Sequence, residues 1–130
     1  MKRILITVGA VLVFFAVAGY GAIYLWIDHD VRKNIALAQS KYSGKAEDAL
    51  IAYLLDESNS PQNRSHIAVW TLGQIQSKKS VPVLTSLYHN DPEGKTCRGN
   101  HSAMLCQYEI YKALNAQRIN WWPLHAYLNK

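Results

Sequence analysis

The feature that most constrains this chain is an uninterrupted apolar run close to its N-terminus. Residues 4–27 carry no charged side chain, and 20 of these 24 residues are hydrophobic. At about 1.5 Å per residue, a helix of this length is about 36 Å long and crosses a hydrocarbon core of about 30 Å with some tilt. The sequence therefore predicts one crossing of the lipid bilayer, through residues 4–27.

The flanks of the run indicate how it lies in the membrane. Aromatic rings gather at its C-terminal end, where they favour the headgroup level: Tyr20, Tyr24 and Trp26. The α-amino group and two basic side chains precede the run, against two basic side chains soon after it, Arg32 and Lys33. This small excess predicts that the N-terminus lies inside. We expect a single-pass protein of the bacterial inner (cell) membrane. Everything after Asp28 then faces the periplasm or the exterior.

A cleaved secretory signal is the alternative reading of the same segment. Lys2 and Arg3 resemble a basic n-region, and Ala16-Val17-Ala18 offers a cleavage site between small residues. Cleavage there would leave the apolar segment 19–27 as the start of the mature chain. We therefore favour an uncleaved anchor over residues 1–30. Within it, Ala18-x-x-x-Ala22 is a small-residue pair that permits a homodimer of spans.

The remainder of the chain has the composition of a folded domain. Lys2 and Arg3 aside, it holds 12 basic and all 9 acidic residues, a net charge of +3, and the basic positions are scattered. A nucleic-acid interface would gather them in a patch or stripe, so we expect no nucleic-acid partner. Charged residues make up 18% of the chain and aromatic residues 11%, which argues against a disordered region.

Apolar side chains after residue 30 recur at helical spacing, in short segments separated by turn residues. We expect an all-α chain, because no alternating strand pattern and no Asn-Gly or Asp-Gly turn is found. Residues 31–43 continue the first helix or kink from it as a juxtamembrane linker, and residues 90–100 form a polar loop. Further helices are predicted over 45–56, 60–75, 78–89, 102–117 and 122–128.

These helices repeat along the sequence. Leu84 aligns with Ile51 at an offset of 33 residues, and Pro123 aligns with Pro82 at an offset of 41. A period in the thirties, with an insertion in the second unit, indicates repeated helical hairpins that must stack to bury their apolar faces. About two and a half hairpins fill residues 44–130, close to the minimum for a stable stack. Its ends therefore need a cover, from residues 31–42, a partner or a second copy.

One stretch carries a family resemblance. Arg64-x-x-x-Ala68-x-x-x-Leu72-Gly73-x-Ile75, followed by Val81-Pro82-x-Leu84-x-x-Leu87, resembles a HEAT-like repeat of the phycobilisome-lyase type. The close match covers about 25 residues, and weaker echoes reach the C-terminus. In the second unit Asn115 replaces the glycine, Gln117 replaces the isoleucine, and Cys106 stands where the arginine would be. The resemblance implies a short α-solenoid that binds other proteins, with these repeated positions used for packing.

Aromatic residues supply candidate anchors for a protein partner, because they dominate binding hot spots. The candidates are Trp70, Tyr111, Trp121, Trp122 and Tyr127. The alternative for each is a place in the core. Adjacent positions of a helix point about 100° apart, so Trp121 and Trp122 do not both fit one narrow seam.

Cys97 and Cys106 are the only cysteines. In an oxidising compartment the pair predicts a disulfide that fastens the insertion, stabilising the fold by about 2–3 kcal/mol. The alternatives are two free thiols or a metal site. For the metal site, Cys97, His101 and Cys106 would be ligands, with His89 or His125 as the fourth, although this spacing matches no strong zinc pattern.

The sequence offers no catalytic constellation and no phosphate-binding glycine loop, so we expect neither an enzyme nor a cofactor. Our first hypothesis is a non-enzymatic, membrane-anchored protein-binding or scaffold module presented outside the cytoplasm. A narrower alternative is a periplasmic inhibitor or immunity protein, because small helical modules suit that work. The third is a metal-binding activity at the insertion that contains the two cysteines.

Overall fold

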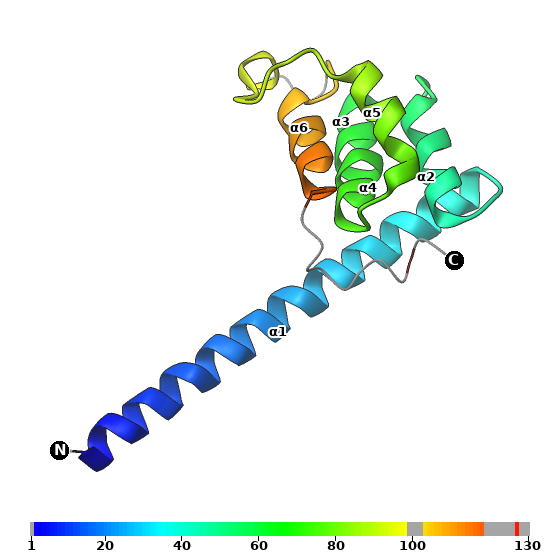
Figure 1. Cartoon of the computed structure of the whole chain (residues 1–130). Helices are drawn as coiled ribbons and strands as arrows, with labels where there is room; N and C mark the ends of the chain where they lie inside the picture. The colour runs from blue at the N-terminus through cyan, green and yellow to red at the C-terminus, as the bar shows by residue number, and fades with distance from the viewer. Residues whose placement is uncertain (1, 99–102, 119–126, 128–130) are drawn as a thin grey trace. The chain divides into compact units, whose positions relative to one another are not determined.

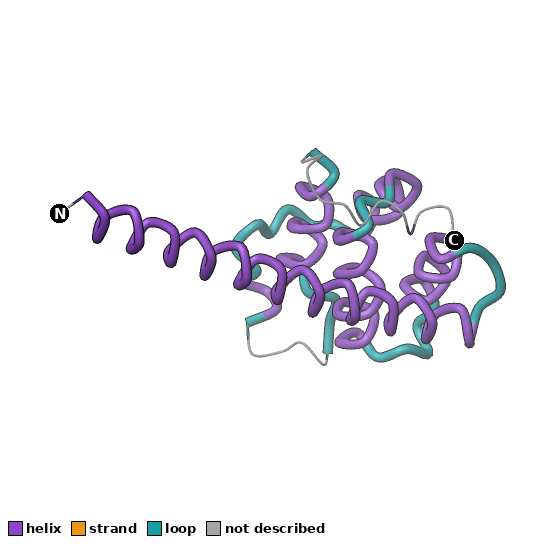
Figure 2. The backbone as a smooth tube through the Cα atoms, turned by 90° about the horizontal axis from the view of Figure 1, so that it is seen from below, coloured by secondary structure: helices purple, strands orange, loops and turns teal. Residues whose placement is uncertain are grey.

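The computed structural model describes residues 2–98, 103–118 and 127, and their side chains from residue 7 onward. Within these ranges every regular element is a helix, which confirms the all-α prediction (Figures 1 and 2). The α-helices are α1 (Lys2–Lys41), α2 (Ala46–Leu55), α3 (Pro61–Asn63), α4 (Trp70–Gln74), α5 (Val81–Leu87) and α6 (Gln107–Ala116). A π-helical segment, η1 (Arg64–Val69), joins α3 to α4, and two 3₁₀ turns are η2 (Lys78–Ser80) and η3 (Lys95–Cys97).

By its internal contacts the chain divides into two units, residues 1–30 and residues 31–130. The first unit is the N-terminal part of α1. From residue 7 onward most of its large apolar side chains are exposed, up to 68% for Phe14 and Trp26. The helix is long and apolar enough to cross a membrane, a property that an N-terminal signal sequence shares.

The second unit begins with the last part of α1, which continues as α-helix to Lys41. Val31, Ile35 and Ala38 recur at i, i+4 and i+7, and all three are buried within this unit. The chain then turns at Gly44, whose φ of +124° is open to glycine at little cost. Residues 31–41 are therefore packed helix rather than a linker between two parts.

The remaining helices of the second unit pack as two neighbouring hairpins. α2 packs against η1 and α4, and α5 packs against α6. α6 also packs against α4 and η1, so the second helices of the two hairpins lie side by side (Figure 1). The approach of α4 to α6 is close, because a Cβ at Gly73 would lie 3.0 Å from the Cα of Ala113.

Serine side chains cap two helix starts. Ser60 precedes Pro61, and its hydroxyl accepts a hydrogen bond from the N–H of Asn63 at 3.2 Å. The Ser77 hydroxyl accepts from the N–H of Ser80 at 3.1 Å, which caps η2 before it leads into α5.

Other predicted boundaries are wrong. α5 ends at Leu87 rather than residue 89, because the backbone at Tyr88 is extended. α6 begins at Gln107 rather than residue 102, and described residues 103–106 form a turn. The predicted helix over 60–75 contains the π-helical segment η1. The predicted helix over 122–128 lies outside the described residues except for Tyr127.

A polar cluster fixes the end of α1 against the end of α2. The Tyr42 hydroxyl donates a hydrogen bond to the carboxylate of Asp56. Lys41 lies 3.4 Å from Asp56 Oδ2 and donates to Asn59 Oδ1 at 2.7 Å. The hydrogen bond from Tyr42, followed by those from Ser58, holds the pKa of Asp56 well below its usual range. The carboxylate thus stays ionised at neutral pH and fastens the two helix ends.

Candidate binding groove

An open groove of about 450 Å³ lies in the second unit, where α2 and α5 end and where α3 and α6 begin. Its lining combines apolar side chains with a few polar ones. The most relevant residues are Pro61, Arg64, Leu87, His89, Met104 and Leu105. A concave surface of this size falls within the usual range for ligand sites, about 300–1,000 Å³.

Arg64 connects the groove to the packing of the first hairpin. It is the first residue of η1, and its Nε donates to the carbonyl oxygen of Leu54 at 2.6 Å. That carbonyl belongs to the last turn of α2, where no intrahelical donor is available. In the described part of the chain, the Nη groups of Arg64 donate to no protein oxygen. One edge of the guanidinium therefore bonds the end of α2, and Arg64 also lines the groove.

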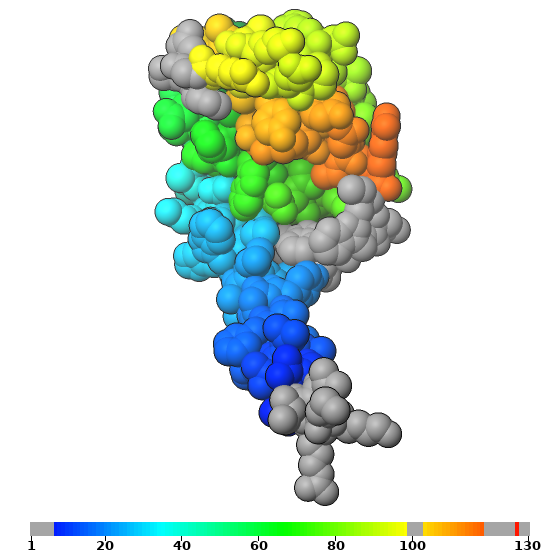
Figure 3. All heavy atoms as spheres, turned by 90° about the vertical axis from the view of Figure 1, so that its left-hand side faces the viewer, coloured from blue at the N-terminus to red at the C-terminus, as the bar shows by residue number. Residues whose placement is uncertain are grey.

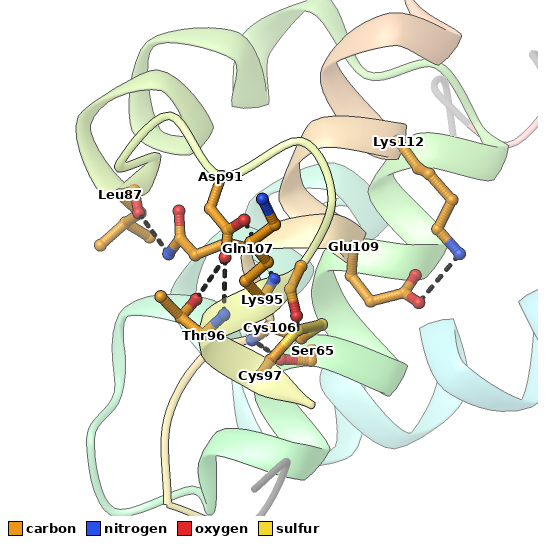
Figure 4. The surroundings of a disulfide bond; sticks show 11 residues. Ser65, Leu87, Asp91, Lys95, Thr96, Cys97, Cys106, Gln107, Glu109 and Lys112 are labelled. Atoms are coloured by element: carbon orange, nitrogen blue, oxygen red, sulfur yellow. Dashed lines mark hydrogen bonds and ion pairs between the residues drawn. A yellow bond between two sulfur atoms is a disulfide. The ribbon is translucent and has the colours of Figure 1, made fainter. Parts of the chain in front are cut away.

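The π-helical segment η1 connects the groove to the residue before α6. Its last hydrogen bond runs from the N–H of Trp70 to the carbonyl of Ser65, five residues back. Ser65 is buried, and its hydroxyl accepts from the N–H of Cys106 at 3.0 Å (Figure 4). This bond ties η1 to the residue that precedes α6. Sequence reasoning missed the π-helical segment, because its apolar spacing also suits an ordinary helix.

The predicted disulfide is present in the structure. Cys97, at the end of η3, pairs with Cys106, and the two Cα atoms are 5.1 Å apart (Figure 4). Both cysteines are buried. The bond therefore closes a loop that contains three residues of the groove lining, 103–105.

The segment before the disulfide is ordered by one carboxylate. Asp91 accepts hydrogen bonds from the Thr96 hydroxyl at 2.6 Å, the Thr96 N–H at 2.8 Å and the Lys95 N–H at 3.0 Å. These bonds, those from Thr96 first, hold the pKa of Asp91 below its usual value. At Gly94, φ is +62° and a Cβ would lie 2.7 Å from the Cβ of Tyr108, so only glycine fits. This segment, yellow in Figure 3, lies beside α6, in orange.

Gln107 joins the two helices of the second hairpin at the groove. Its Nε2 donates to the carbonyl of Leu87 at 3.1 Å (Figure 4). Its Oε1 accepts from the N–H of His89 at 2.6 Å. Two backbone groups at the end of α5 are thereby satisfied by a buried side chain of α6. No sequence pattern indicates this role of Gln107, because glutamine is common in helices.

The residues of the HEAT-like motif fall into three groups. Five are buried: Ala68, Leu72, Gly73, Ile75 and Leu84. Three are partly buried: Arg64, Val81 and Leu87. Pro82 is exposed in the first turn of α5, where it has little to pack against. The buried positions lie at the contacts between helices, and Arg64 bonds a helix end.

The three aromatic candidates that the structure describes differ in their surroundings. Trp70 is half-buried beside a hollow of about 80 Å³ between α4 and α6. Tyr111 is also half-buried and stacks on Tyr88, with ring centroids 6.3 Å apart. Tyr127 is buried, and its hydroxyl accepts from Arg32 Nε at 2.7 Å, so the prediction of an accessible anchor there is wrong. Trp121 and Trp122 lie outside the described residues.

Sequence reasoning also missed two exposed residues. Met104, at 38% exposure, lines the groove. Tyr108, at 43%, is the second residue of α6 and lies beneath the ammonium group of Lys112. No signal in the sequence singled them out, because both fit the spacing of a buried helical face. The structure exposes Met104 because the helix starts only at Gln107.

Over the described ranges, no three His, Cys, Asp or Glu side chains are placed to share a metal ion. His101 and His125, two of the ligands considered for the metal alternative, fall outside those ranges. Both cysteines are used by the disulfide, whereas a metal would need their thiolates. Comparison of the chain with protein-family models, with curated proteins and with solved structures gave no match.

Proposed function

We propose that this chain is a single-pass membrane protein whose second unit binds another protein outside the cytoplasm. The observation that supports the proposal is the presence of two features in the same chain. An exposed apolar helix of membrane-spanning length comes first, and a folded helical unit with an open groove follows. The anchor confines the unit to a membrane surface, and the groove offers a place for a partner.

The HEAT-like architecture is part of this proposal. Two neighbouring helical hairpins with contact between their second helices are the expected core of a short α-solenoid. The close approach at Gly73 and the bond from Arg64 to the end of α2 give physical roles to two motif positions. Burial of Val31, Ile35 and Ala38 supports the segment 31–41 as the cover of an open edge.

The orientation with the N-terminus inside has two supports. Lys2 and Arg3 precede the span, and the disulfide Cys97–Cys106 belongs to the unit that would be outside. Disulfides persist in oxidising compartments such as the periplasm and are rare in the cytosol. An inhibitor or immunity protein would be one form of such a binding module.

In-cell photocrosslinking tests the proposal on the full-length chain. A photoreactive amino acid at Met104, in the groove, should give a defined crosslinked band in the membrane fraction. The matched position Leu55 is 52% exposed, lies outside the groove lining, and should give none. A thiol-reactive, membrane-impermeant reagent should label an added cysteine at Lys78, after the span, in intact spheroplasts. Absence of any Met104-specific band, or labelling only after lysis, would contradict the proposal.

A further inference from the structure

We propose that the groove binds a short partner segment in which an apolar side chain stands next to an aspartate or glutamate. This inference rests on the proposed binding function and gives the partner a chemistry. The supports are the apolar wall formed by residues 103–105, the charges at the groove and the position of the disulfide.

The apolar part of the segment is read from the wall of the groove. Ala103, Met104 and Leu105 are consecutive, lie outside any helix and line the groove. Three apolar residues in a row are unusual in a surface turn, which normally carries polar side chains. Leu87 adds apolar surface from the end of α5. Methionine adapts its shape to different partners, so this wall suits one or two apolar side chains of varied form.

The acidic part is read from the charges. Arg64 is the arginine of the groove lining, and Glu57, an exposed side chain, is the single carboxylate among the described lining residues. The Nε of Arg64 bonds Leu54, and the Nη groups point to no acceptor in the described ranges. Gln107 also lines the groove at the start of α6, a helix of ten residues whose N-terminus no side chain caps. A guanidinium and the positive end of a helix dipole both favour a carboxylate.

The disulfide holds this surface in place. Cys106 directly follows the apolar wall, and its N–H is bonded to the buried hydroxyl of Ser65. Cys97 fastens the other end of the loop to the segment ordered by Asp91. Reduction would remove the covalent link between Cys97 and Cys106, and with it the constraint on the wall residues directly before Cys106. The oxidised chain should therefore bind the segment more tightly than the reduced chain.

Fluorescence anisotropy with defined probes tests the inference, using the full-length chain in lipid nanodiscs. The probes are fluorescein-labelled, end-blocked heptapeptides, Gly-Ser-Leu-Glu-Leu-Ser-Gly and the same peptide with lysine in place of glutamate. We expect the glutamate probe to bind about threefold to fivefold more tightly than the lysine probe, because one partly exposed charge pair contributes little free energy. A third probe with alanines for both leucines should lose about tenfold or more in affinity.

Variants locate the binding. Met104→Asp places a carboxylate in the apolar wall and should lower the affinity for the acidic probe about tenfold. Leu55→Asp lies outside the groove and should leave that affinity unchanged. His89→Glu should narrow the preference between the acidic and basic probes. Circular dichroism of each variant checks that its fold is intact. Treatment with dithiothreitol should weaken binding of the acidic probe.

Two outcomes would overturn the inference: equal affinity for the acidic and basic probes, or unchanged binding by a folded Met104→Asp variant. If a Met104 crosslink forms in cells but the probes show no charge preference, the binding function stands and the acidic segment is wrong. A crosslinked band whose mass equals two copies of this chain would replace the foreign segment by a second copy and overturn it as well.

Discussion

The two parts of helix α1 have the same backbone structure and opposite surfaces. Between residues 11 and 17, adjacent side chains are exposed on every side of the helix, from Val11 at 47% to Phe14 at 68%. After residue 30, apolar residues occupy one stripe, which is buried, and Arg32 and Lys33 beside it are exposed. The pattern of side chains, and not the helix itself, therefore decides which surroundings each part requires.

The largest expected effect comes from placing charge in the first part. The double substitution Val13→Asp and Val17→Asp costs about 2.5–3.5 kcal/mol per aspartate at the centre of a span. We expect the protein to leave the membrane pellet after alkaline extraction, while the thermal unfolding of the second unit is unchanged. Retention of the double variant in the pellet would show that residues 7–27 do not anchor the chain.

The next effect comes from trimming the buried stripe. Ile35 is 6% exposed, so Ile35→Ala should lower the free energy of unfolding of the second unit by about 2–4 kcal/mol. Ile23→Ala is the matched change in the first part, where the side chain is 54% exposed. It should leave urea unfolding of the second unit in detergent unchanged. Equal effects of the two variants would erase the distinction between the two parts of α1.

Glycines sharpen the same contrast at the level of helix contacts. Gly73→Ala would bring a Cβ to 3.0 Å from Ala113, and we expect a loss of about 1–3 kcal/mol in stability. A Cβ at Gly19 has no atom within 4 Å, so Gly19→Ala should be tolerated in the membrane helix. The denaturant midpoint measures the effect of Gly73→Ala on stability, and membrane extraction measures the effect of Gly19→Ala on anchoring. A neutral Gly73→Ala would mean that α4 and α6 separate easily.

The smallest effect concerns the polar cluster at the end of the stripe. Because the folded-state pKa of Asp56 is below the usual value near 3.8, its contribution to stability is present at neutral pH. It is lost as the pH falls below about 4, towards the lowered folded-state pKa. Asp56→Asn should remove this part of the acid dependence, seen by thermal unfolding between pH 7 and pH 3. Glu57→Gln, at an exposed neighbour, is the control and should keep it.

The sequence predicted what depends on local pattern. Helical segments begin at Pro61 and Lys78, within one residue of the predicted starts, and Cys97 pairs with Cys106 as predicted. The apolar run and the helical spacing of Val31, Ile35 and Ala38 were also predictable, because hydropathy and periodicity depend only on residues close in the sequence.

The details of the groove were not predictable, because they depend on contacts between residues distant in the sequence. Gln107 bonds the end of α5 across 20 residues, and Ser65 bonds Cys106 across 41. The start of α6 was placed too early, since periodicity continues through Leu105 although the chain there is fastened by the disulfide instead. No local signal carries such information.

The π-helical segment η1 also affects how this chain can be aligned with others. A π-helical turn closes its hydrogen bonds five residues apart, about one residue more than an α-helical turn. Counting from Arg64 to Leu72 at constant α-helical spacing therefore misplaces side chains around the helix axis by part of a turn. An alignment of this hairpin with a regular repeat should allow a one-residue gap between residues 64 and 70. An alignment without that gap will give true relatives too low a score.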